Sequence, residues 1–339
     1  MNIVYVGNKL SSHGYSVTGV ETLGKQLESI GYNVVSTSDK KSQLLRVADM
    51  LYTVIKYRRK TDVLLIDTYS KVAFWYALII SMFAIFTKLK YIPILRGGNL
   101  PSRLEGNKVM SNIIFKNSFR NISPSKYLMN EFDKKGFEAE YIPNNIDVSN
   151  YQFRQREKCV PKLLYVRSFD LIYNPQMAIH VLQKVVAKYP EAELCMVGPD
   201  KDGSMQDCKN LVAEFGLQEK VVFTGKLSKA EWHTLADEYS IFINTTNFDN
   251  MPVSVMEAMA LGIPVISTNV GGIPFLLDHN ETALLVDKGD TEAMVKSICH
   301  LIENPTVAET LSKTGRHYIE GFDWEVIKHR WQDLLALPQ

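Results

Sequence analysis

One stretch, Asn247–Pro274, constrains the fold of this chain more than any other, because helix and strand signals follow each other there within a few residues. Pro252 suits the first position of a helix, where its missing N–H costs nothing. The pattern predicts a helix over Val253–Leu261 that stops at Gly262, followed by a short strand that begins at Val265. This succession is typical of a helix packed on a parallel sheet.

Glu257 is the single charged residue of that helix, and no basic residue lies three or four positions from it. An unpaired carboxylate in an apolar helix costs free energy unless a polar group meets it. Helical side chains lean towards the helix start, where free N–H groups can hold a phosphate. The stretch alone leaves two interpretations open: Glu257 binds a ligand, or it reaches water from a helix packed on a sheet.

The composition predicts a globular protein of about two domains with ample core. The chain has 339 residues, of which 46% are hydrophobic and 22% charged. The four cysteines show no metal-binding spacing, so we interpret them as reduced thiols of a cytoplasmic protein. The N-terminus enters a strand directly, and we expect no signal peptide. The most apolar run, Val72–Thr87, is shorter than the ~20 residues of a spanning helix and predicts a buried helix.

The net charge of +1 is unevenly distributed. Residues 1–150 hold 20 Lys and Arg against 12 Asp and Glu, whereas the remainder holds 18 against 25. A basic half favours an anionic partner such as a membrane surface or an acidic acceptor, although an incidental difference between two domains is the alternative.

Strands and helices alternate along both halves, which predicts two parallel α/β sheets with a boundary in the polar segment 148–161. The first half has predicted strands at Ile3–Val6, Tyr32–Ser36, Val63–Ile66, Tyr91–Leu95, Ile122–Pro124 and Ala139–Ile142, with helices at 20–30, 72–87 and 125–135. The second half has predicted strands at Leu163–Val166, Glu193–Val197, Val221–Thr224 and Ile241–Asn244, with helices at 175–188, 204–215, 229–238, 291–302 and 324–335.

Two strand ends of the first half carry candidate site residues. The loop after the first strand contains His13, Gly14 and Gly19 and suits a hydroxyl-bearing partner, although a loop residue in water is the favoured interpretation of His13. The loop lacks a GxGxxG fingerprint, which disfavours a dehydrogenase. Arg96 ends a later strand, where it could hold a donor phosphate or an anionic acceptor, or pair with Asp67 at a neighbouring strand end.

The second half resembles the donor-binding domain of a retaining GT-B glycosyltransferase of glycosyltransferase family 4. The order and spacing of its pieces agree from Leu163 to about Val286. The matching pieces are Arg167 at a strand end, Val197–Pro199, Val222–Gly225, Pro252–Val265, Thr268–Gly272 and Leu285–Val286, and Ile142–Asp147 resembles the family's hinge turn. The resemblance implies GT-B architecture, with two Rossmann-like parallel-sheet domains facing a cleft.

The resemblance also assigns the domains. It implies an acceptor-binding domain over residues 1–148 and a nucleotide-sugar donor-binding domain over residues 149–321. A C-terminal helix over about 322–339 is expected to pack back on the first domain.

Several donor-site roles are carried over from the family residue by residue. Glu257 corresponds to the glutamate that holds the ribose hydroxyls, and Asp249, where the family usually has Glu, to the carboxylate on the donor sugar. Arg167 corresponds to the arginine on the diphosphate. The backbone that lies against the sugar and β-phosphate is that of Asn250, Met251, Pro252, Val253 and Ser254, and further donor contacts fall on Gly198, Pro199 and Gly225. The family's second phosphate-binding lysine is missing. Lys226 is the first candidate to replace it and Lys201 the second, although a solvated loop lysine is the favoured interpretation of each.

We therefore expect a hexosyltransferase-type enzyme (EC 2.4) that moves a sugar from a UDP- or GDP-sugar to an acceptor hydroxyl with retention. Asp249, Arg167 and Arg96 are its predicted catalytic residues, and no cofactor or metal ion is expected. The expected partners are the donor and a saccharide or lipid-linked acceptor in bacterial polysaccharide or glycolipid assembly, without nucleic acid. The basic first half is expected to contact the inner face of the membrane peripherally. The alternatives are a GT-B sugar-nucleotide epimerase and a non-catalytic nucleotide-sugar-binding module.

Overall fold

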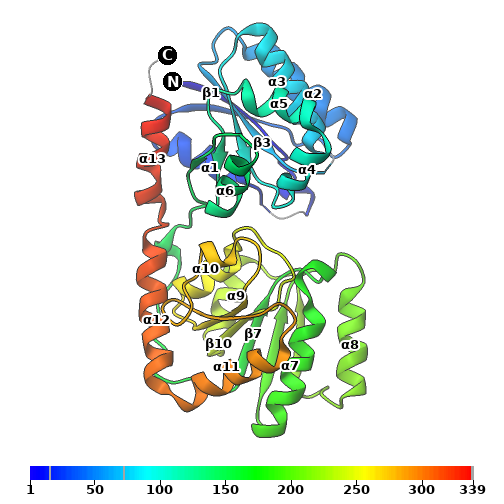
Figure 1. Cartoon of the computed structure of the whole chain (residues 1–339), viewed down its shortest axis with the longest axis vertical. Coiled ribbons are helices and arrows are strands. Elements are labelled where there is room, and N and C mark those ends of the chain that lie inside the picture. The colour runs from blue at the N-terminus through cyan, green and yellow to red at the C-terminus, as the bar shows by residue number, and fades with distance from the viewer. Residues whose placement is uncertain (15–16, 72, 337–339) are drawn as a thin grey trace. The chain divides into compact units, whose positions relative to one another are not determined.

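The computed structural model describes residues 1–14, 17–71 and 73–336, which form two compact units (Figure 1). The first unit comprises Met1–Pro143 and the segment from Lys328 onward, and the second comprises Asn144–Ile327. Each unit contains one six-stranded sheet whose paired strands are all parallel. The α/β prediction of two parallel sheets is therefore confirmed.

The first sheet has the strand order β2-β1-β3-β4-β5-β6. Its strands are β1 (Asn2–Val6), β2 (Asn33–Thr37), β3 (Val63–Thr68), β4 (Tyr91–Leu95), β5 (Ile122–Ser123) and β6 (Glu140–Tyr141). Its helices are α1 (Gly19–Ser29), α2 (Gln43–Tyr57), α3 (Ala73–Thr87), α4 (Leu100–Gly106), α5 (Lys108–Lys116) and α6 (Lys126–Lys134). Right-handed crossovers place α1 on one face of the sheet and α2 and α3 on the other, as Figure 1 shows. Every residue of β3 and β4 is buried, because helices cover both faces of a parallel sheet.

Helix α3 differs from the fully buried helix that its sequence predicts. Its inner face is buried at Phe74, Ile80 and Ala84, whereas Met82 and Phe86 on its outer face are exposed. The prediction of a buried helix is therefore wrong for one face. In the described part of the chain, no helix combines the length and the apolar character needed to cross a membrane.

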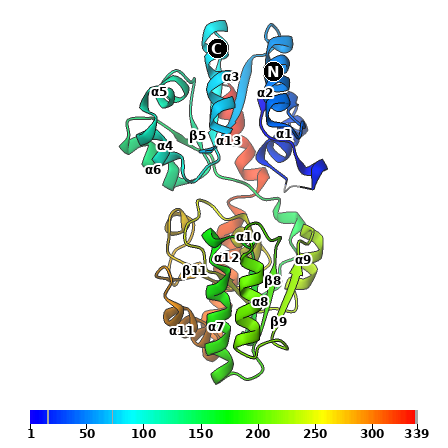
Figure 2. The same cartoon turned by 90° about the vertical axis from the view of Figure 1, so that its right-hand side faces the viewer.

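The second sheet has the strand order β12-β11-β10-β7-β8-β9. Its strands are β7 (Lys162–Val166), β8 (Glu193–Val197), β9 (Val221–Gly225), β10 (Ile241–Asn244), β11 (Val265–Thr268) and β12 (Leu284–Val286). Its helices are α7 (Pro175–Lys188), α8 (Ser204–Glu214), α9 (Lys229–Ala236), α10 (Val253–Ala260), α11 (Thr291–Glu303) and α12 (Pro305–Glu320). Helices α7 and α8 run side by side across one face (Figure 2), and α9 and α10 pack on the other.

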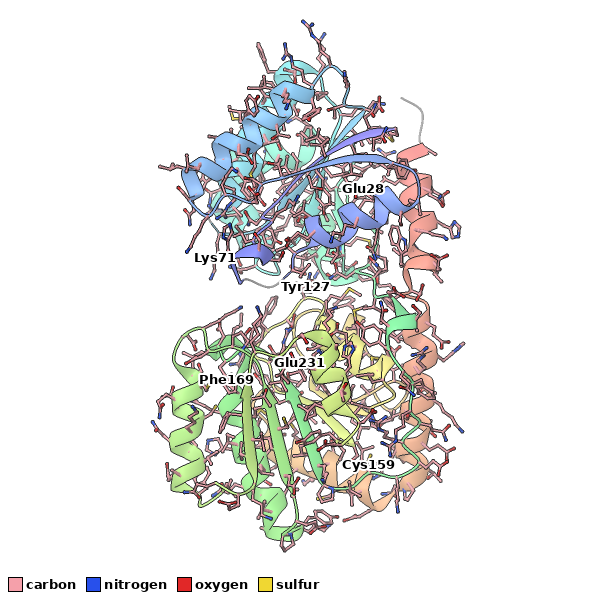
Figure 3. The ribbon with its side chains drawn as sticks, turned by 180° about the vertical axis from the view of Figure 1, so that it is seen from behind. Glu28, Lys71, Tyr127, Cys159, Phe169 and Glu231 are labelled. Carbon is pink, nitrogen blue, oxygen red and sulfur yellow. The ribbon has the colours of Figure 1, made fainter. Side chains whose placement is uncertain are left out.

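The four cysteine side chains all carry free thiols, as predicted. Cys159, labelled in Figure 3, is buried, and burial raises the pKa of its thiol to about 12. Burial likewise raises the pKa of Cys195 to about 11. These two thiols therefore act as small apolar side chains of the core.

The last helix, α13 (Trp324–Ala336), begins in the second unit. Its part from Lys328 onward belongs to the first unit, where the Arg330 guanidinium donates from Nη1 to the Tyr141 carbonyl over 3.3 Å.

Candidate functional site

The second sheet has a topological switch point between β7 and β10, which are hydrogen-bonded neighbours. The chain proceeds from β7 outward to β8 and β9 on one side, and from β10 outward to β11 and β12 on the other. In open parallel sheets, ligands bind beyond the carboxyl ends of the strands at such a point. Arg167 directly follows β7, and Asp249 lies in the loop between β10 and α10. Two predicted site residues thus lie on the two sides of the switch point.

Arg167 and Asp249 form an ion pair through Nη2 and Oδ2, and the two side chains are 16% and 12% exposed. The Arg167 guanidinium also stacks on the Tyr173 ring, with its carbon 4.2 Å from the ring centroid. Behind it, Phe169 (labelled in Figure 3) packs into the core against Tyr165. Arg167 Nε is buried and has no hydrogen-bond partner among the described residues. A buried donor without a partner is costly, so this atom indicates the position of a missing acceptor.

The loop that carries Asp249 is fixed by its own hydrogen bonds. Thr246 donates from Oγ1 to the Phe248 carbonyl over 2.9 Å, and the Asn247 N–H donates to the Ile172 carbonyl over 2.8 Å. The Asn250 N–H donates to Asp249 Oδ1 over 2.8 Å. The loop that carries the carboxylate is therefore held in place before any ligand binds.

Gly272 supports the same loop from behind. Its N–H donates to the Asp249 carbonyl over 2.8 Å. A Cβ atom added at Gly272 would lie 1.8 Å from the Asn250 carbonyl oxygen, so only glycine allows this close approach of the two backbones. The Gly271–Gly272 pair of the sequence motif therefore shapes the loop that holds Asp249.

Helix α10 begins where this loop ends. Pro252 is its cap, with φ −71° and ψ 112°, and the first helical residue is Val253. Met251 is buried, and Ser254 has a buried Oγ without a hydrogen-bond partner among the described residues. The first N–H groups of a helix lack partners within the helix and carry partial positive charge. This helix start, with Ser254 and the Arg167 guanidinium, provides donors for an anionic group.

Glu257 is 4% exposed, so it does not reach water. The prediction that it is unpaired within the chain is wrong: Tyr151 donates its hydroxyl to Glu257 Oε1 over 2.9 Å, and Lys229 Nζ lies 2.6 Å from the same oxygen. Burial and the nearby Glu257 carboxylate raise the pKa of the Tyr151 hydroxyl well above its usual range. Sequence reasoning missed both partners.

His233 completes this cluster. Its ring packs on Tyr151 with the ring centroids 4.6 Å apart, and its Nε2 is buried without a hydrogen-bond partner among the described residues. Burial lowers the pKa of His233, and the Lys229 charge adds to that effect against the opposing Glu257 charge. We therefore expect a neutral imidazole at physiological pH.

The remaining donor-side residues lie at the ends of β8 and β9. The Gly198 N–H donates to the Gly225 carbonyl over 2.9 Å, which brings two predicted residues together. The Pro199 carbonyl accepts from the Phe169 N–H over 2.9 Å. Lys226 directly follows Gly225, at the far edge of the sheet from β12.

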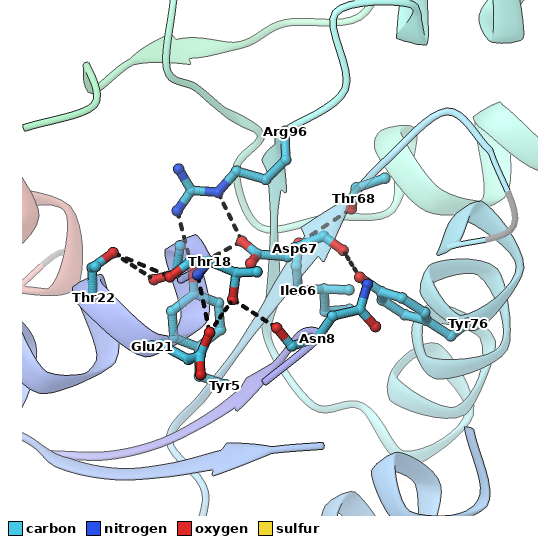
Figure 4. A network of polar contacts seen from close by, with 11 residues as sticks. Tyr5, Asn8, Thr18, Glu21, Thr22, Ile66, Asp67, Thr68, Tyr76 and Arg96 are labelled. Carbon is cyan, nitrogen blue, oxygen red and sulfur yellow. Dashed lines mark hydrogen bonds and ion pairs between the residues drawn. The ribbon is translucent and has the colours of Figure 1, made fainter. Parts of the chain in front are cut away.

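In the first unit, Arg96 pairs with Asp67, which was one of its two open interpretations. Arg96 Nε lies 2.9 Å from Asp67 Oδ1, and Asp67 is fully buried. Tyr5 donates its hydroxyl to the same carboxylate oxygen over 2.9 Å and accepts from Arg96 Nη2 over 3.1 Å (Figure 4). Burial acts to lower the pKa of Arg96, but the charges of Asp67 and the neighbouring tyrosines reverse that effect and raise it.

The predicted acceptor-side loop is next to this pair. A Cβ atom at Gly19 would lie 2.4 Å from Arg96 Nη2, so the glycine makes room for the guanidinium. His13 is exposed, and its Nε2 lies 2.9 Å from the Asp39 carbonyl oxygen. Gly14 follows with φ 86°.

A cavity of about 450 Å³, lined in part by Asn8, opens at the carboxyl ends of β1 and β3. Its lining includes Arg46, Lys71, Tyr69 and Tyr76.

Two Rossmann-like parallel sheets, the second with a polar site at its switch point, are the architecture of the GT-B fold. The family described as Glycosyl transferases group 1 matches residues 150–318, and this chain belongs to that family.

The chain is 28% identical over 177 residues to an uncharacterized glycosyltransferase of Haemophilus influenzae. The aligned segment covers 52% of this chain and 47% of that protein. The chain is 23% identical over 221 residues to a GDP-mannose-dependent alpha-(1-6)-phosphatidylinositol monomannoside mannosyltransferase of Mycolicibacterium smegmatis, covering 58% and 56%. The match thus spans about half the length of these curated relatives. The structure of Anabaena HepE in complex with UDP shares the fold, with a TM-score of 0.80 at 15% identity over 99% of this chain and 100% of that one.

Proposed function

We propose that this protein transfers a sugar from a nucleotide-sugar donor to an acceptor hydroxyl with retention of anomeric configuration. One observation carries the proposal: the Arg167–Asp249 pair lies at the switch point beside the start of α10, where Arg167 Nε and Ser254 Oγ are buried without partners among the described residues. A diphosphate with an attached sugar supplies acceptors for both atoms.

The donor would be held in two parts. The N–H groups of Val253 and Ser254 and the Arg167 guanidinium would bind the diphosphate, while Asp249 would turn to the hydroxyls of the sugar. The Arg167–Asp249 pair therefore has to open when the donor binds. Fixed positive charge around the diphosphate then stabilises the leaving group as the sugar bond breaks.

Glu257 would hold the ribose hydroxyls. Lys229 and Tyr151 keep its carboxylate compensated in a buried site, so the ligand need not provide that compensation alone. Lys229 would also place positive charge near the nucleotide, a role that sequence reasoning gave to Lys226. Gly198, Pro199 and Gly225 would line the donor at the neighbouring strand ends.

No side chain at the switch point is proposed as a nucleophile. Membership of the family favours attack on the same face of the sugar, with the departing phosphate taking the proton of the acceptor hydroxyl. The bond to phosphate breaks as the bond to the acceptor oxygen forms, so atoms and charge balance. One relative is GDP-mannose-dependent and HepE was solved in complex with UDP, so both nucleotides stay candidates for this chain.

The first unit would bind the acceptor. His13, Gly14 and Gly19 are the proposed loop on that side, and Arg96 would act there through its charge, held in place by Asp67. The acceptor is a saccharide or a lipid-linked saccharide of bacterial polysaccharide or glycolipid assembly, which the phosphatidylinositol mannoside named for one relative supports.

A donor screen tests the proposal. The full chain is incubated with UDP- and GDP-hexoses, with and without saccharide and lipid-linked acceptors, and both the released nucleotide and the sugar product are measured. We expect acceptor-dependent release of one nucleotide and a product with the donor's anomeric configuration. An epimerised sugar nucleotide, or tight donor binding without turnover for every acceptor, would overturn the proposal in favour of an epimerase or a binding module.

A further inference from the structure

We propose that the outer face of α2 and α3 docks this protein on an anionic lipid bilayer. The docking face consists of Tyr52 and Ile55 on α2 and of Trp75, Ile79, Met82, Ile85 and Phe86 on α3. Docking requires neither a bound sugar donor nor sugar transfer, so it can be tested independently of the glycosyltransferase activity.

The apolar side chains of this face are exposed in a continuous stripe. Trp75, Ile79, Met82 and Phe86 are spaced by three or four residues, which places them on one side of a helix. Phe86 is 85% exposed and Met82 is 52% exposed. The stripe therefore presents between 40% (Ile79) and 85% (Phe86) of each residue's surface to the surroundings of the protein.

Exposed apolar side chains gather on this layer of the molecule. Among the described residues, 18 large hydrophobic side chains are exposed, and ten of them lie on α2, α3 and α5. Helix α3 packs against both α2 and α5, so these side chains belong to one surface. Soluble monomers rarely expose large continuous apolar patches unless the patch meets a partner.

The core of the first unit does not explain the stripe. The opposite side of α3, with Phe74, Ala77 and Ile80, already fills the space between the helix and the sheet. Polar residues at the outer positions would leave that packing unchanged. The outer apolar residues therefore have a role outside the folded core.

A rim of cations surrounds one end of the docking face. Helices α2 and α3 both connect parallel strands, so their C-terminal ends lie at the same edge of the sheet. The cations at this edge are Lys56 in the last turn of α2, Arg58, Arg59 and Lys60 after α2, and Lys88 and Lys90 after α3. The carboxylate nearby in sequence, Asp62, accepts a hydrogen bond from the Asn2 N–H. From Lys40 to Lys116 the chain holds 14 Lys and Arg against four Asp and Glu.

An exposed apolar stripe with a rim of cations fits an anionic bilayer better than it fits a second copy of the chain. In a symmetric dimer the same face meets itself, and the part of the chain from Lys40 to Lys116, with 14 Lys and Arg against four Asp and Glu, offers few carboxylates to pair with the cation rim of the other copy. Anionic headgroups attract the rim instead, and the boundary between headgroups and acyl chains accepts Trp, Tyr and Phe side chains. Lys56 already lies over the Tyr52 ring, 5.9 Å from its centroid, and can extend towards headgroups.

The test is co-flotation of the full chain with vesicles of phosphatidylcholine alone or with added phosphatidylglycerol. We expect binding to the anionic vesicles that weakens with salt. The double variant Met82→Glu/Phe86→Glu is expected to bind on the order of tenfold more weakly, and so is Arg58→Glu/Arg59→Glu. Val326→Glu, which adds one glutamate at an exposed apolar position of α13, is the control and should bind as the wild type does.

Circular dichroism melts of each variant establish that it is folded, and sedimentation equilibrium without lipid measures self-association. The absence of wild-type binding, or equal binding of the Met82→Glu/Phe86→Glu variant, overturns the proposal. A wild-type dimer that this variant dissociates, without vesicle binding, also overturns it and makes the face an interface between copies. An inactive chain that still binds anionic vesicles supports docking and counts only against the transfer activity.

Discussion

Arg167 and Asp249 neutralise each other across the switch point of the second sheet, one directly after β7 and the other in the loop after β10. Each charge is compensated by the other, and both side chains remain partly exposed to solvent. The pair therefore holds opposite charges in position at the place where a diphosphate and a sugar would separate them. Opening the pair costs free energy, which is offset when Arg167 binds the diphosphate and Asp249 binds the sugar hydroxyls.

The first prediction concerns the charge of Arg167. Replacing it with alanine removes the guanidinium that would offset leaving-group charge, and we expect kcat/KM for the donor to fall by about 100–1,000-fold. Arg154→Ala removes an exposed arginine of the same unit and is the matched control, with turnover near that of the wild type. Steady-state release of the nucleotide measures both. Full turnover by Arg167→Ala would exclude the proposed role.

The second prediction concerns donor choice at Asp249. Asp249→Glu lengthens the carboxylate by one methylene while keeping its charge and acceptors. We expect the ratio of kcat/KM for two hexoses on the same nucleotide to change by about tenfold or more, while affinity for the free nucleotide changes little. An unchanged ratio would mean that Asp249 does not contact the sugar.

The third prediction separates the ribose from the rest of the nucleotide at Glu257. Calorimetry would compare the free nucleoside diphosphate with its 2′,3′-dideoxy analogue, which lacks both ribose hydroxyls. In the wild type the analogue should bind about tenfold more weakly, because a hydrogen bond to a charged group is worth about 1.5–3 kcal/mol. In Glu257→Ala the two ligands should bind alike. A difference that persists in the variant would place the ribose elsewhere.

Lys229→Met is a second variant for the same comparison of the two ligands. It keeps the Glu257 carboxylate and its hydrogen bond from Tyr151, so the preference for the natural ribose should persist while overall affinity falls.

The sheets were predictable from sequence because parallel strands buried on both faces are short apolar runs that end at polar residues or glycines. Helix α2 was missed, although Met50 and Val54 stand at helical spacing on its buried side, because it starts after Ser42 without a side-chain cap hydrogen bond. Helix α12 was missed although Pro305 in its first turn is a start signal. The exposed side of α3 could not be foreseen, because an apolar helix carries no local sign of which face its neighbours cover.

The site was predictable only where its residues follow strands or share a motif. Arg96 and Asp67 end neighbouring strands, so their pairing could be proposed as one of two alternatives. The partners of Glu257 could not be found in this way, because Tyr151 is 106 positions away and Lys229 lies on a different helix. No local pattern encodes contacts between such distant segments, which depend on how α9 and α10 pack.

The fourth prediction tests the support of the Asp249 loop. Gly272→Ala would place a Cβ atom against the Asn250 carbonyl, so the loop has to shift. We expect a loss of about 2–3 kcal/mol in the free energy of unfolding, together with weaker donor binding. Gly106→Ala is the control: nothing lies within 4 Å of its added Cβ, and alanine at the end of α4 should be neutral or stabilising by up to about 1 kcal/mol. Urea unfolding measures both, and equal stability of the two variants would contradict the prediction.

The fifth prediction follows from the lowered pKa of His233. Because this histidine binds its proton less readily in the folded chain than in the unfolded chain, lowering the pH favours unfolding. The neutral His233 side chain contributes its full stability above the ordinary histidine pKa of about 6.5. That contribution is lost as the pH falls from about 6.5 through the lowered pKa of His233 in the folded chain. His233→Gln removes the titrating group, so the variant should lose less stability than the wild type between about pH 7.5 and about pH 5.5. His317→Gln, at a side chain that is 91% exposed, is the control for the exchange of a histidine for a glutamine. Urea unfolding at each pH measures the three proteins, and parallel curves for His233→Gln and the wild type would show that His233 accepts its proton equally well in the folded and unfolded chains.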